Sequence, residues 1–424
     1  MYAIGDDYMK HIYTSLDIGS DSIKVVVCEL YQNKLNLLAS SSYHSKGIKK
    51  GLITNVEDAT ESIRGSLDEV ENVLGIKINK VIANIPSYFA NFTVVKGEIE
   101  IEGQEVRYDD INTLLDSILT QKREDDAEII TIIPVDFRVD NETGIKDPIK
   151  MNGKVLGIRA ILVTTEKKYI YSVVGLLENM GLEVADISIT GVGDINALRN
   201  KKMDKSVGAI INIGNDITNI SLYNRGVIVK NKIINMGGKH ISNDISYMYK
   251  TDKDTANELK LHFALAHKRN ASTSDTKKIK TAYDDELKIN QFEISEVVSS
   301  RLEEILNLAK KEINILTSKQ IDYIIITGGT SNMADIDMVI GDVLGRDANV
   351  GSIKLVGIRD NKYSTCVGNI IHYINKQKLR GIEDSLVSDE EASKLSSMKK
   401  NYQDIDNEKM LEKLTEYFLA NRRI

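Results

Sequence analysis

Apolar and polar positions along the chain follow two patterns, one typical of strands and one typical of helices. Short apolar runs such as "IKVVVCEL", "VGAIINIG" and "DYIIITGG" are rich in β-branched residues and predict buried strands. Residues 56–74 and 294–316 carry apolar side chains at helical spacing, and 169–180 is a further helical stretch closed by Gly181. Mixed strands and helices over this length predict a layered α/β fold.

The order of these elements indicates two versions of one plan. Residues 2–91 and 207–345 each open with a strand, an "xIG" turn and a second strand, and each then reaches a helix. Residues 84–165 do not follow this plan and indicate a separate module with a helix between strands. Residues 268–288 are polar and irregular, so we expect a surface loop there.

The end of the chain has a different character. Residues 383–407 contain seven acidic residues against three lysines and predict a flexible linker. The segment that follows, 408–424, reads "EKMLEKLTEYFLANRRI" and has an apolar helical face made of Met410, Leu411, Leu414, Tyr417, Phe418 and Ile424. Arg422 and Arg423 lie at its end. We interpret it as a membrane-binding amphipathic helix, because the alternative, a helix docked on the body or on a partner, needs no tether.

The overall composition narrows the possible classes of protein. The chain has 424 residues, of which 42% are hydrophobic and 28% charged, and its net charge of −7 argues against a nucleic-acid partner. Cys28 and Cys366 lie in distant apolar segments, so they form neither a zinc cluster nor a disulfide framework. No run approaches the roughly 18 apolar residues of a membrane span, and the N-terminus lacks the apolar core of a signal peptide. We therefore expect a cytoplasmic protein.

The first candidate binding site is the stretch "LDIGSDSIKVVV". A strand-turn-strand loop of this kind points backbone N–H groups into a concavity that suits a phosphate. Asp17 could hold a hydrated Mg²⁺ through water, and Lys24 could reach a phosphate as a point charge. The small residues of the turn, Gly19, Ser20 and Ser22, allow close approach of a ligand.

Two later stretches add to this signal. "GAIINIGNDITNISLY" at 208–223 has the shape of a second phosphate turn, but it carries Asn212, Asn215 and Asp216 where an acid and several glycines are usual. In "IIITGGTSNM", Gly328 and Gly329 follow a buried strand and let the backbone pass close to a nucleotide. One phosphate turn in each half and a late Gly-Gly turn predict a two-lobed cleft that closes on a nucleotide.

Longer stretches carry a resemblance to a known family. They are "SKGIKKGLITNVEDATESI" (45–63), "IIPVDFRVDNETGIKDPIKMNGKVLGIRAILVTT" (132–165) and "MGGKHISNDISYMYKTDKDTANELK" (236–260). Together with the order of the loops, they resemble the FtsA family of bacterial cell-division proteins, within the actin-like superfamily. The resemblance covers most of residues 12–382. It is specific, because the inserted module is absent from actins, sugar kinases and heat-shock chaperones.

The resemblance implies a domain organisation. The expected fold is an α/β, actin-like two-lobed fold with an inserted small α+β subdomain of the 1C or SHS2 type and a C-terminal amphipathic helix. Subdomain 1A is expected at 1–83, 166–206 and 351–382, subdomain 1C at 84–165, subdomain 2A at 207–236 and 309–350, and subdomain 2B at 237–308. The linker at 383–407 and the helix at 408–424 complete this organisation.

The resemblance also implies a function and a set of partners. The family links FtsZ filaments to the cytoplasmic face of the cell membrane and helps to assemble the division septum, as ATP-binding filament formers. The implied partners are the C-terminal peptide of FtsZ, further copies of the chain, anionic membrane lipid and later division proteins, and the implied cofactors are ATP and Mg²⁺. The implied nucleotide-binding residues are Asp17, Gly19, Ser20, Ser22, Lys24, Asn212, Gly214, Asn215, Thr218, Gly237, Gly238, Glu258, Lys260, Gly328, Gly329 and Thr330.

The second loop departs from the pattern of the family, which runs Asp-x-Gly-x-Gly-Thr-Thr-Asp. Asn212 replaces the first Asp and removes one negative charge from the expected magnesium shell. Asp216 replaces a Gly and adds a charge near the expected γ-phosphate, where two unit charges 4 Å apart repel by roughly 4 kcal/mol at an effective dielectric near 20. We therefore expect weak ATP binding and at most weak ATPase activity, and we do not expect an enzyme.

Two other functions are consistent with parts of the sequence. A scaffold resembling the type IV pilus protein PilM would share the inserted module, but that family generally ends without a tethered amphipathic helix. A sugar or acetate kinase would need a substrate pocket with a catalytic acid, and the sequence shows no such constellation.

Overall fold

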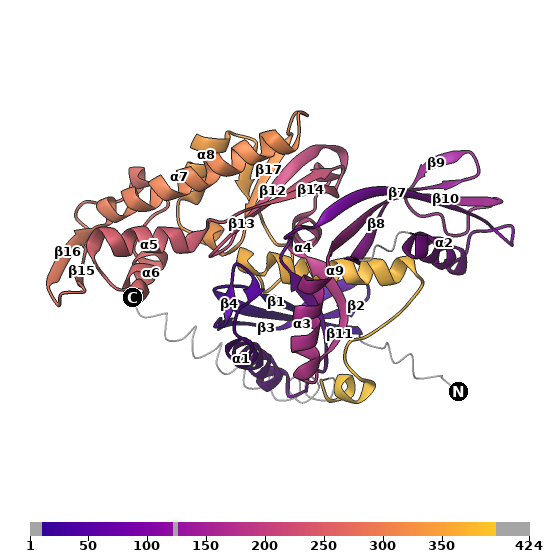
Figure 1. Ribbon diagram of the computed structural model, residues 1–424, viewed down its shortest axis with the longest axis horizontal. Helices are drawn as coiled ribbons and strands as arrows, with labels where there is room; N and C mark the ends of the chain where they lie inside the picture. Colours follow the sequence, from indigo (N-terminus) through magenta and orange to yellow (C-terminus); the bar gives the residue numbers. More distant parts are fainter. Residues whose placement is uncertain (1–10, 122–125, 396–424) are drawn as a thin grey trace, which may run out of the picture.

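The computed structural model describes residues 11–121 and 126–395, which form two lobes and an insert at one end (Figure 1). The predicted membrane helix at 408–424 and residues 396–407 of the predicted linker lie outside the described residues.

The first lobe is built on a five-stranded sheet in the order β11-β6-β1-β2-β3. Its strands are β1 (His11–Ile18), β2 (Ser22–Tyr31), β3 (Lys34–His44), β6 (Lys80–Ile85) and β11 (Glu183–Ile189). Strands β1, β2 and β3 are antiparallel, whereas β6 runs parallel to both β1 and β11. Its helices are α1 (Val56–Leu74), α3 (Lys167–Asn179), α4 (Thr190–Leu198) and α9 (Ser364–Leu379). Helix α1 lies against β2 and β3 on one side of the sheet, and α9 covers β1, β2 and β6 on the other (Figure 1).

Helix α1 shows how closely local sequence sets an element. Its bounds equal the predicted 56–74. The Asn55 side chain accepts hydrogen bonds from the N–H groups of Glu57 and Asp58 at the first turn, and Gly75, with φ of 67°, ends the helix in the left-handed conformation. Ile63 and Leu67, which lie at helical spacing, are fully buried, whereas Val56 at the first position of the helix is 59% exposed.

The second lobe repeats the plan of the first. Its strands are β12 (Val207–Ile213), β13 (Thr218–Asn224), β14 (Val227–Ile234), β17 (Tyr323–Thr327) and β18 (Ala348–Val350). Their order, β18-β17-β12-β13-β14, matches β11-β6-β1-β2-β3 strand for strand, with the same parallel and antiparallel pairs. The duplication predicted from the sequence is confirmed. Around this sheet lie α5 (Gly238–Tyr249), α6 (Lys253–His262), α7 (Gln291–Leu316) and α8 (Ile336–Leu344).

The insert is a separate layer with its own core. Its antiparallel sheet, in the order β7-β10-β8-β9, consists of β7 (Asn91–Glu100), β8 (Ala127–Val139), β9 (Glu142–Ile145) and β10 (Val155–Glu166). Helix α2 (Tyr108–Gln121) packs on this sheet. The contact is close, because a methyl group on Gly97 would lie 2.8 Å from Ile118 of α2.

One region predicted as a loop contains a hairpin. Residues 268–288 were expected to be irregular, but β15 (Thr276–Lys280) and β16 (Glu286–Asn290) pair there as an antiparallel ribbon. Buried and exposed side chains alternate along these two strands, as is typical of a half-buried ribbon. Ile279 and Ile289 are buried, while Lys280, Glu286 and Lys288 between them face solvent. The remaining short elements are β4 (Ile48–Lys49), β5 (Leu52–Ile53), η1 (Met203–Lys205), η2 (Lys268–Asn270), η3 (Gly329–Asn332) and η4 (Asn361–Tyr363).

The first half of the predicted linker differs from the expectation. Residues 383–395 pack on the first lobe, and 389–395 form a short helix. Leu386 and Val387 are buried in the core of that lobe. The Leu386 N–H donates to the Ile12 carbonyl at 2.8 Å, which holds this segment against β1. Net acidity predicted a solvated tether here, but two adjacent apolar side chains are enough to anchor this segment.

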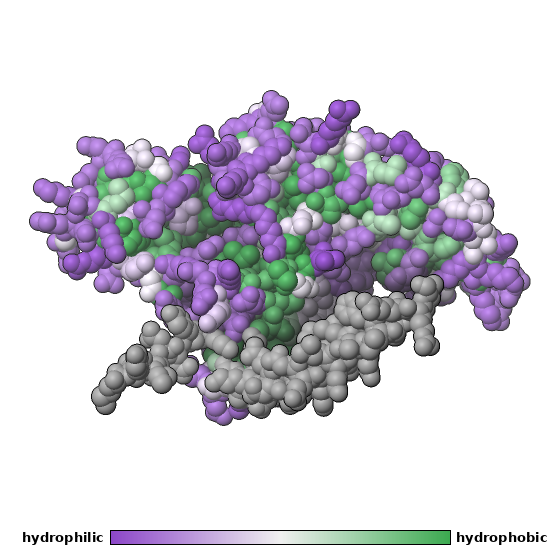
Figure 2. Space-filling view, turned by 180° about the vertical axis from the view of Figure 1, so that it is seen from behind, coloured by the Kyte–Doolittle hydropathy of each residue, from purple (hydrophilic) through white to green (hydrophobic). Residues whose placement is uncertain are grey.

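The surface is mainly polar. Hydrophilic side chains predominate on the face shown in Figure 2, with smaller hydrophobic areas between them. Within 11–121 and 126–395, no helix has the length and apolarity to cross a bilayer.

A buried histidine joins the first lobe to the insert. His372 of α9 lies within hydrogen-bonding distance of Thr131 of β8, with 3.2 Å between Nε2 and Oγ1. Burial, together with the nearby charge of Lys376, lowers the pKa of His372 to about 3. The ring is therefore neutral in the folded protein at pH 5 to 7, whereas an unfolded chain protonates it below its ordinary pKa of about 6.5.

This difference predicts a pH-dependent stability. The contribution of the neutral ring is fully present above about pH 6.5 and is lost as the pH falls toward 3, because protons then bind the unfolded state preferentially. We expect His372→Gln to remove about 2 kcal/mol of the loss in unfolding free energy between pH 7 and pH 5. Urea titrations of wild type and variant measure it, with the exposed His44→Gln as the matched control. Equal pH slopes for His372→Gln and wild type would contradict the prediction.

Candidate functional site

A cavity of about 560 Å³ lies between the two lobes, and both lobes line it. Most of the predicted nucleotide-binding residues are on its wall: Asp17, Gly19, Ser20, Ser22, Lys24, Asn212, Gly214, Asn215, Lys260, Gly328, Gly329 and Thr330. The tertiary structure thus brings together the three separate loops that the sequence singled out.

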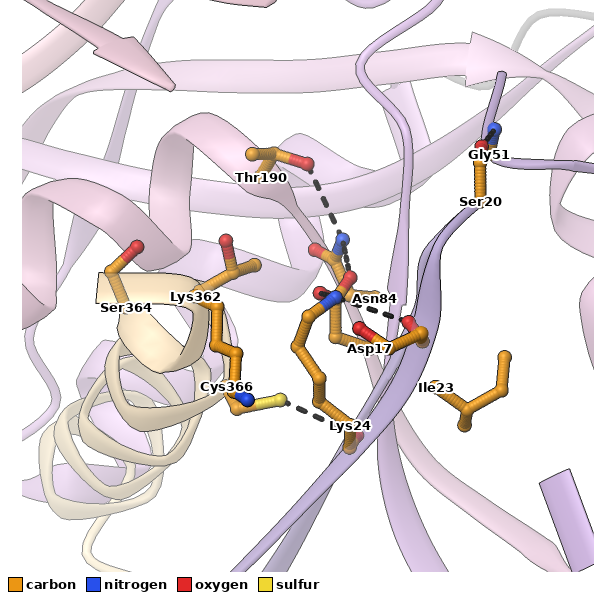
Figure 3. Close-up of polar contacts among 12 residues, drawn as sticks. Asp17, Ser20, Ile23, Lys24, Gly51, Asn84, Thr190, Lys362, Ser364 and Cys366 are labelled. Atoms are coloured by element: carbon orange, nitrogen blue, oxygen red, sulfur yellow. Dashed lines mark hydrogen bonds and ion pairs between the residues drawn. The ribbon is translucent and has the colours of Figure 1, made fainter. Parts of the chain in front are cut away.

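The first loop is the turn between β1 and β2. Asp17 and Lys24 are cross-strand partners, and Lys24 Nζ lies 3.1 Å from Asp17 Oδ2. Asn84 of β6 donates to the other carboxylate oxygen at 3.1 Å and also to Thr190, as Figure 3 shows. Burial by itself would lower the pKa of Lys24, but the Asp17 carboxylate outweighs it and raises that pKa. Lys24 therefore remains a cation on the wall of the cavity.

The turn itself is tight. A methyl group on Gly19 would lie 2.7 Å from the Ser22 carbonyl oxygen and 2.8 Å from Lys24 Nζ, so only glycine fits. Ser20 Oγ accepts a hydrogen bond from the N–H of Gly51 at 2.8 Å, drawn at the upper right of Figure 3. The β4–β5 turn thereby fixes the rim of the cavity above the first loop.

The second loop, between β12 and β13, is supported by the start of α5. The N–H groups of Gly238 and Lys239 donate to the carbonyls of Gly214 and Asn215, both at 2.9 Å. A methyl group on Gly237 would lie 2.5 Å from the Gly214 carbonyl oxygen. Gly237 and Gly238 therefore support the loop from behind and are not on the cavity wall.

Thr218 and Glu258 also lie off the wall. Thr218 is fully buried, and its hydroxyl donates to the Met236 carbonyl at 2.8 Å. Glu258 points away from the cavity, with 57% of its side chain exposed and an ion pair to Lys277 at 2.5 Å. Asn257, Lys260, Leu261 and His262 of the same helix, α6, line the cavity, whereas the Glu258 carboxylate pairs with Lys277 of β15.

Asp216 is engaged in a contact between the lobes. Its Oδ2 accepts from the N–H of Lys50 in the first lobe at 2.9 Å, and its Oδ1 lies 3.4 Å from Lys239 Nζ. These contacts offset the negative charge that was expected to repel a phosphate. Asp216 still lines the cavity, but it acts with two partners and not as an isolated charge.

The third loop and α6 complete the wall. Gly328 has φ of 90°, and a methyl group there would lie 2.4 Å from Asn212 Oδ1, so the second and third loops are in close contact. Thr330 donates to the Gly214 carbonyl at 3.3 Å. Lys260 is buried, which lowers its pKa to about 8, although Asp21 opposes this. None of the ion pairs among the described residues includes Lys260, so its charge is available to an anionic ligand.

Several residues of the site carry no local sequence signal. Thr190 of α4, Asn84 of β6, Lys362 of η4 and Asp360, which precedes η4, line the cavity from segments that no motif identifies. Asp194 of α4 lies directly behind Asn212, with 2.8 Å between its Oδ2 and Asn212 Nδ2. These residues converge only because α4 and the segments near α9 fold back onto the junction of the two lobes.

The residues present fit a nucleotide. The cavity volume lies within the range of small-molecule sites, and Lys24, Lys260 and Lys362 supply positive charge beside glycine turns. The described residues do not form a dedicated metal site. Within the described ranges, no group of three or more His, Cys, Asp or Glu side chains could hold a metal ion. Asp17 is a single carboxylate, and Lys24 and Asn84 already contact it.

Two family models match the chain. The model described as "Cell division protein FtsA" matches residues 209–368, and "SHS2 domain inserted in FTSA" matches residues 90–164, the insert. The cell-division protein FtsA of Bacillus subtilis is 27% identical over 388 residues, covering 90% of this chain and 88% of that protein. FtsA of Streptococcus pneumoniae is 27% identical over 358 residues, covering 83% and 78%.

Solved structures show the fold. MreB5 of Spiroplasma citri bound to ADP has a TM-score of 0.56 at 14% identity, over 88% of this chain and 99% of that chain. A PilM–PilN type IV pilus biogenesis complex has a TM-score of 0.56 at 13% identity, over 85% and 98%. At these identities the likeness to PilM concerns the fold alone and does not favour the pilus scaffold. The predicted actin-like fold with an SHS2 insert is confirmed, and both family models and the relatives agree that this chain belongs to the FtsA family of cell-division proteins.

Proposed function

We propose that this protein acts in cell division as an ATP-binding, actin-like filament protein that links FtsZ to the cytoplasmic face of the membrane at the septum. One observation carries this proposal: an actin-like cleft and an insert matched by the SHS2 model of FtsA occur in a chain aligned with FtsA over 90% of its length. The proposed role is therefore a mechanical link between FtsZ filaments and the membrane.

ATP is the proposed ligand of the cleft. MreB5, which shares the fold, has been solved with ADP and with AMPPNP, and this supports nucleotide binding by this chain. Lys24 and Lys260 would meet the negative charge of the ligand, and Asp17, which Lys24 and Asn84 already contact, would reach a Mg²⁺ carried by the ATP only through its water shell. Asp216 is occupied by Lys50 and Lys239, so it is not free to activate water, and we expect slow hydrolysis at most.

Subdomain 2B is the proposed contact for the C-terminal peptide of FtsZ. The end of α5 and the turn between β15 and β16 expose Tyr247, Met248 and Tyr283, of which Tyr247 is 89% exposed. Lys250 Nζ lies 5.7 Å from the centre of the Tyr283 ring. Exposed aromatic side chains beside a cation are typical of sites that anchor peptides.

Residues 408–424 are the proposed membrane anchor, with residues 396–407 as the tether. Since 383–395 pack on the first lobe, the tether has about 12 residues, and a flexible chain of that length spans roughly 17–21 Å. Each apolar side chain of one helix contributes about 1 kcal/mol, so a single copy binds weakly. A filament presents many copies, and membrane binding then becomes firm through effective concentration.

The cleft is tested by a pair of matched glycine substitutions. Gly328→Ala would bring a methyl group against Asn212 in a left-handed backbone conformation, and we expect it to weaken binding of a fluorescent ATP analogue at least tenfold. Gly341→Ala on α8 is the control, because nothing lies within 4 Å of the added methyl group. Wild-type affinity in Gly328→Ala would contradict a nucleotide site here, and turnover typical of actin-like ATPases would contradict slow hydrolysis.

The proposed FtsZ contact is tested on two tyrosines. We expect Tyr247→Ala with Tyr283→Ala to weaken binding of an FtsZ C-terminal peptide by tenfold or more, measured by fluorescence anisotropy, because exposed aromatic anchors dominate such contacts. Tyr171→Ala, an exposed tyrosine of α3 in the first lobe, should leave affinity unchanged. If the control weakens binding and the double variant does not, the contact is elsewhere.

The membrane anchor is tested by the same substitution on opposite faces of the predicted helix. Leu414→Glu places a charge in the middle of the apolar face and should release the full chain from vesicles containing anionic lipid, by tenfold or more in affinity. Leu419→Glu makes the same chemical change on the opposite, polar face and should bind as wild type does. Co-sedimentation measures both, and equal release by the two variants would argue against an oriented amphipathic helix.

A further inference from the structure

A two-residue turn lies between the phosphate loops of the two lobes. Strands β4 and β5 pair as a hairpin whose turn is Lys50 and Gly51, with φ of 52° and 75°. Both positions are left-handed, a conformation that glycine adopts freely and that is unfavourable for lysine. Strain of this kind persists only where the surrounding contacts hold the backbone in place, and it is common at ligand sites. The contacts of this turn therefore bear on the function of the cleft.

The two N–H groups of the turn donate to different lobes. The Gly51 N–H donates to Ser20 Oγ in the first phosphate loop at 2.8 Å (Figure 3). The neighbouring Lys50 N–H donates to Asp216 Oδ2 in the second phosphate loop at 2.9 Å. Successive backbone N–H groups of a turn form a concavity that binds anions. The anion at this turn is the carboxylate of Asp216, which comes from the opposite lobe.

The Asp216 carboxylate is buried and has a partner on each oxygen. Its side chain is 9% exposed, and Lys239 Nζ of α5 lies 3.4 Å from its Oδ1. The N–H groups of Gly238 and Lys239, at the start of α5, donate to carbonyls of the second loop. The donors that join the second loop to the β4–β5 turn and to α5 are thus already paired within the protein.

A ligand phosphate gains little at this position. To accept from the Lys50 N–H or from Lys239 Nζ, it must displace the Asp216 carboxylate, so the number of hydrogen bonds from these donors does not rise. The displaced carboxylate loses its partners and lies in the same loop as the phosphate, and the two anions repel. If the carboxylate stays, these donors remain closed to the phosphate. In both cases a further charge on the ligand adds no net attraction here.

We propose that Asp216 is a specificity-determining residue: its carboxylate is an internal anion that joins the two lobes, so the cleft binds a nucleoside diphosphate at least as tightly as the triphosphate. The proposal rests on the proposed binding of a nucleotide in the cleft. It also means that the lobes are held together on this side without a terminal phosphate.

The selectivity is tested by removing the charge of Asp216. Asp216→Asn keeps the shape and an acceptor oxygen for the Lys50 N–H but no longer repels a phosphate. Competition of ADP and of ATP against one fluorescent ADP analogue, at a single Mg²⁺ concentration, gives the ratio of their dissociation constants. We expect wild type to bind ADP at least as tightly as ATP, and Asp216→Asn to shift the ratio about tenfold toward ATP.

An acid of the same lobe provides the control. Asp244 of α5 pairs with Arg301 and is not on the cavity wall. Asp244→Asn should leave the ratio at the wild-type value, which separates the position of Asp216 from a general change in charge. A wild type that binds ATP tenfold tighter than ADP, or equal ratios in wild type and Asp216→Asn, would overturn the proposed selectivity.

The bridge between the lobes is tested without nucleotide. Asp216→Ala removes the acceptor of the Lys50 N–H, and we expect this amide to exchange its hydrogen at least tenfold faster than in wild type. Mass spectrometry of peptides that span 48–53 measures the exchange. Asp216→Asn should retain most of the protection, because it keeps an acceptor, and Asp244→Ala should retain all of it. Equal exchange in Asp216→Ala and wild type would show that the bridge does not hold the lobes in solution.

The failure of the cleft function and the failure of this proposal are distinguishable. If wild type and all variants bind neither nucleotide, the proposed function of the cleft and the selectivity both fail, and the exchange at 48–53 decides the bridge. If wild type binds neither nucleotide but Asp216→Asn binds ATP, the internal anion is supported. If wild type binds both nucleotides and Asp216→Asn leaves their ratio unchanged, the cleft function stands and the proposed selectivity is wrong.

Discussion

The close crossing of α4 and α9 is the contact on which the site depends. A methyl group on Gly368 would lie 1.7 Å from the carbonyl oxygen of Gly193, so only glycine permits the two helices to approach this closely. Gly191 allows a similar approach to Ser221 of β13 in the second lobe. The junction of the two lobes is therefore tightly packed on one side, and the cavity opens beside it.

This crossing concentrates polar groups where the lobes meet. Asp194, Ser364 and Thr365 come from α4 and α9, and they contact Asn212 of the second lobe. A second bridge between the lobes joins Asp216 to the N–H of Lys50 and to Lys239. In each bridge a carboxylate, Asp194 or Asp216, accepts hydrogen bonds from residues of other elements. A charged ligand in the cavity would change the electrostatic energy of both bridges. The cleft can thus couple ligand binding to the relative position of the lobes.

The acids of the site are balanced locally. Asp17 has Lys24 and Asn84, Asp216 has Lys239, and Asp194 has three neutral donors. Lys260 remains without a carboxylate partner among the described ion pairs. Phosphates are the complement of such an arrangement, and their charge would also favour protonation of Lys260, whose pKa burial lowers to about 8.

The sequence by itself determined most of the helices and strands, the duplication and the first loop. Helix α1 begins after the Asn55 cap and ends at Gly75, both set by neighbours in sequence, and the glycine turns of the cavity are local in the same sense. Only the tertiary structure decided which distant groups meet. Asp194 contacts Asn212 across two lobes, Glu258 pairs with Lys277 and does not line the cavity, and Leu386 joins the first core in spite of its acidic surroundings. The reason is physical: periodicity and capping act within a few residues, whereas the pairing of a buried charge depends on how whole elements cross.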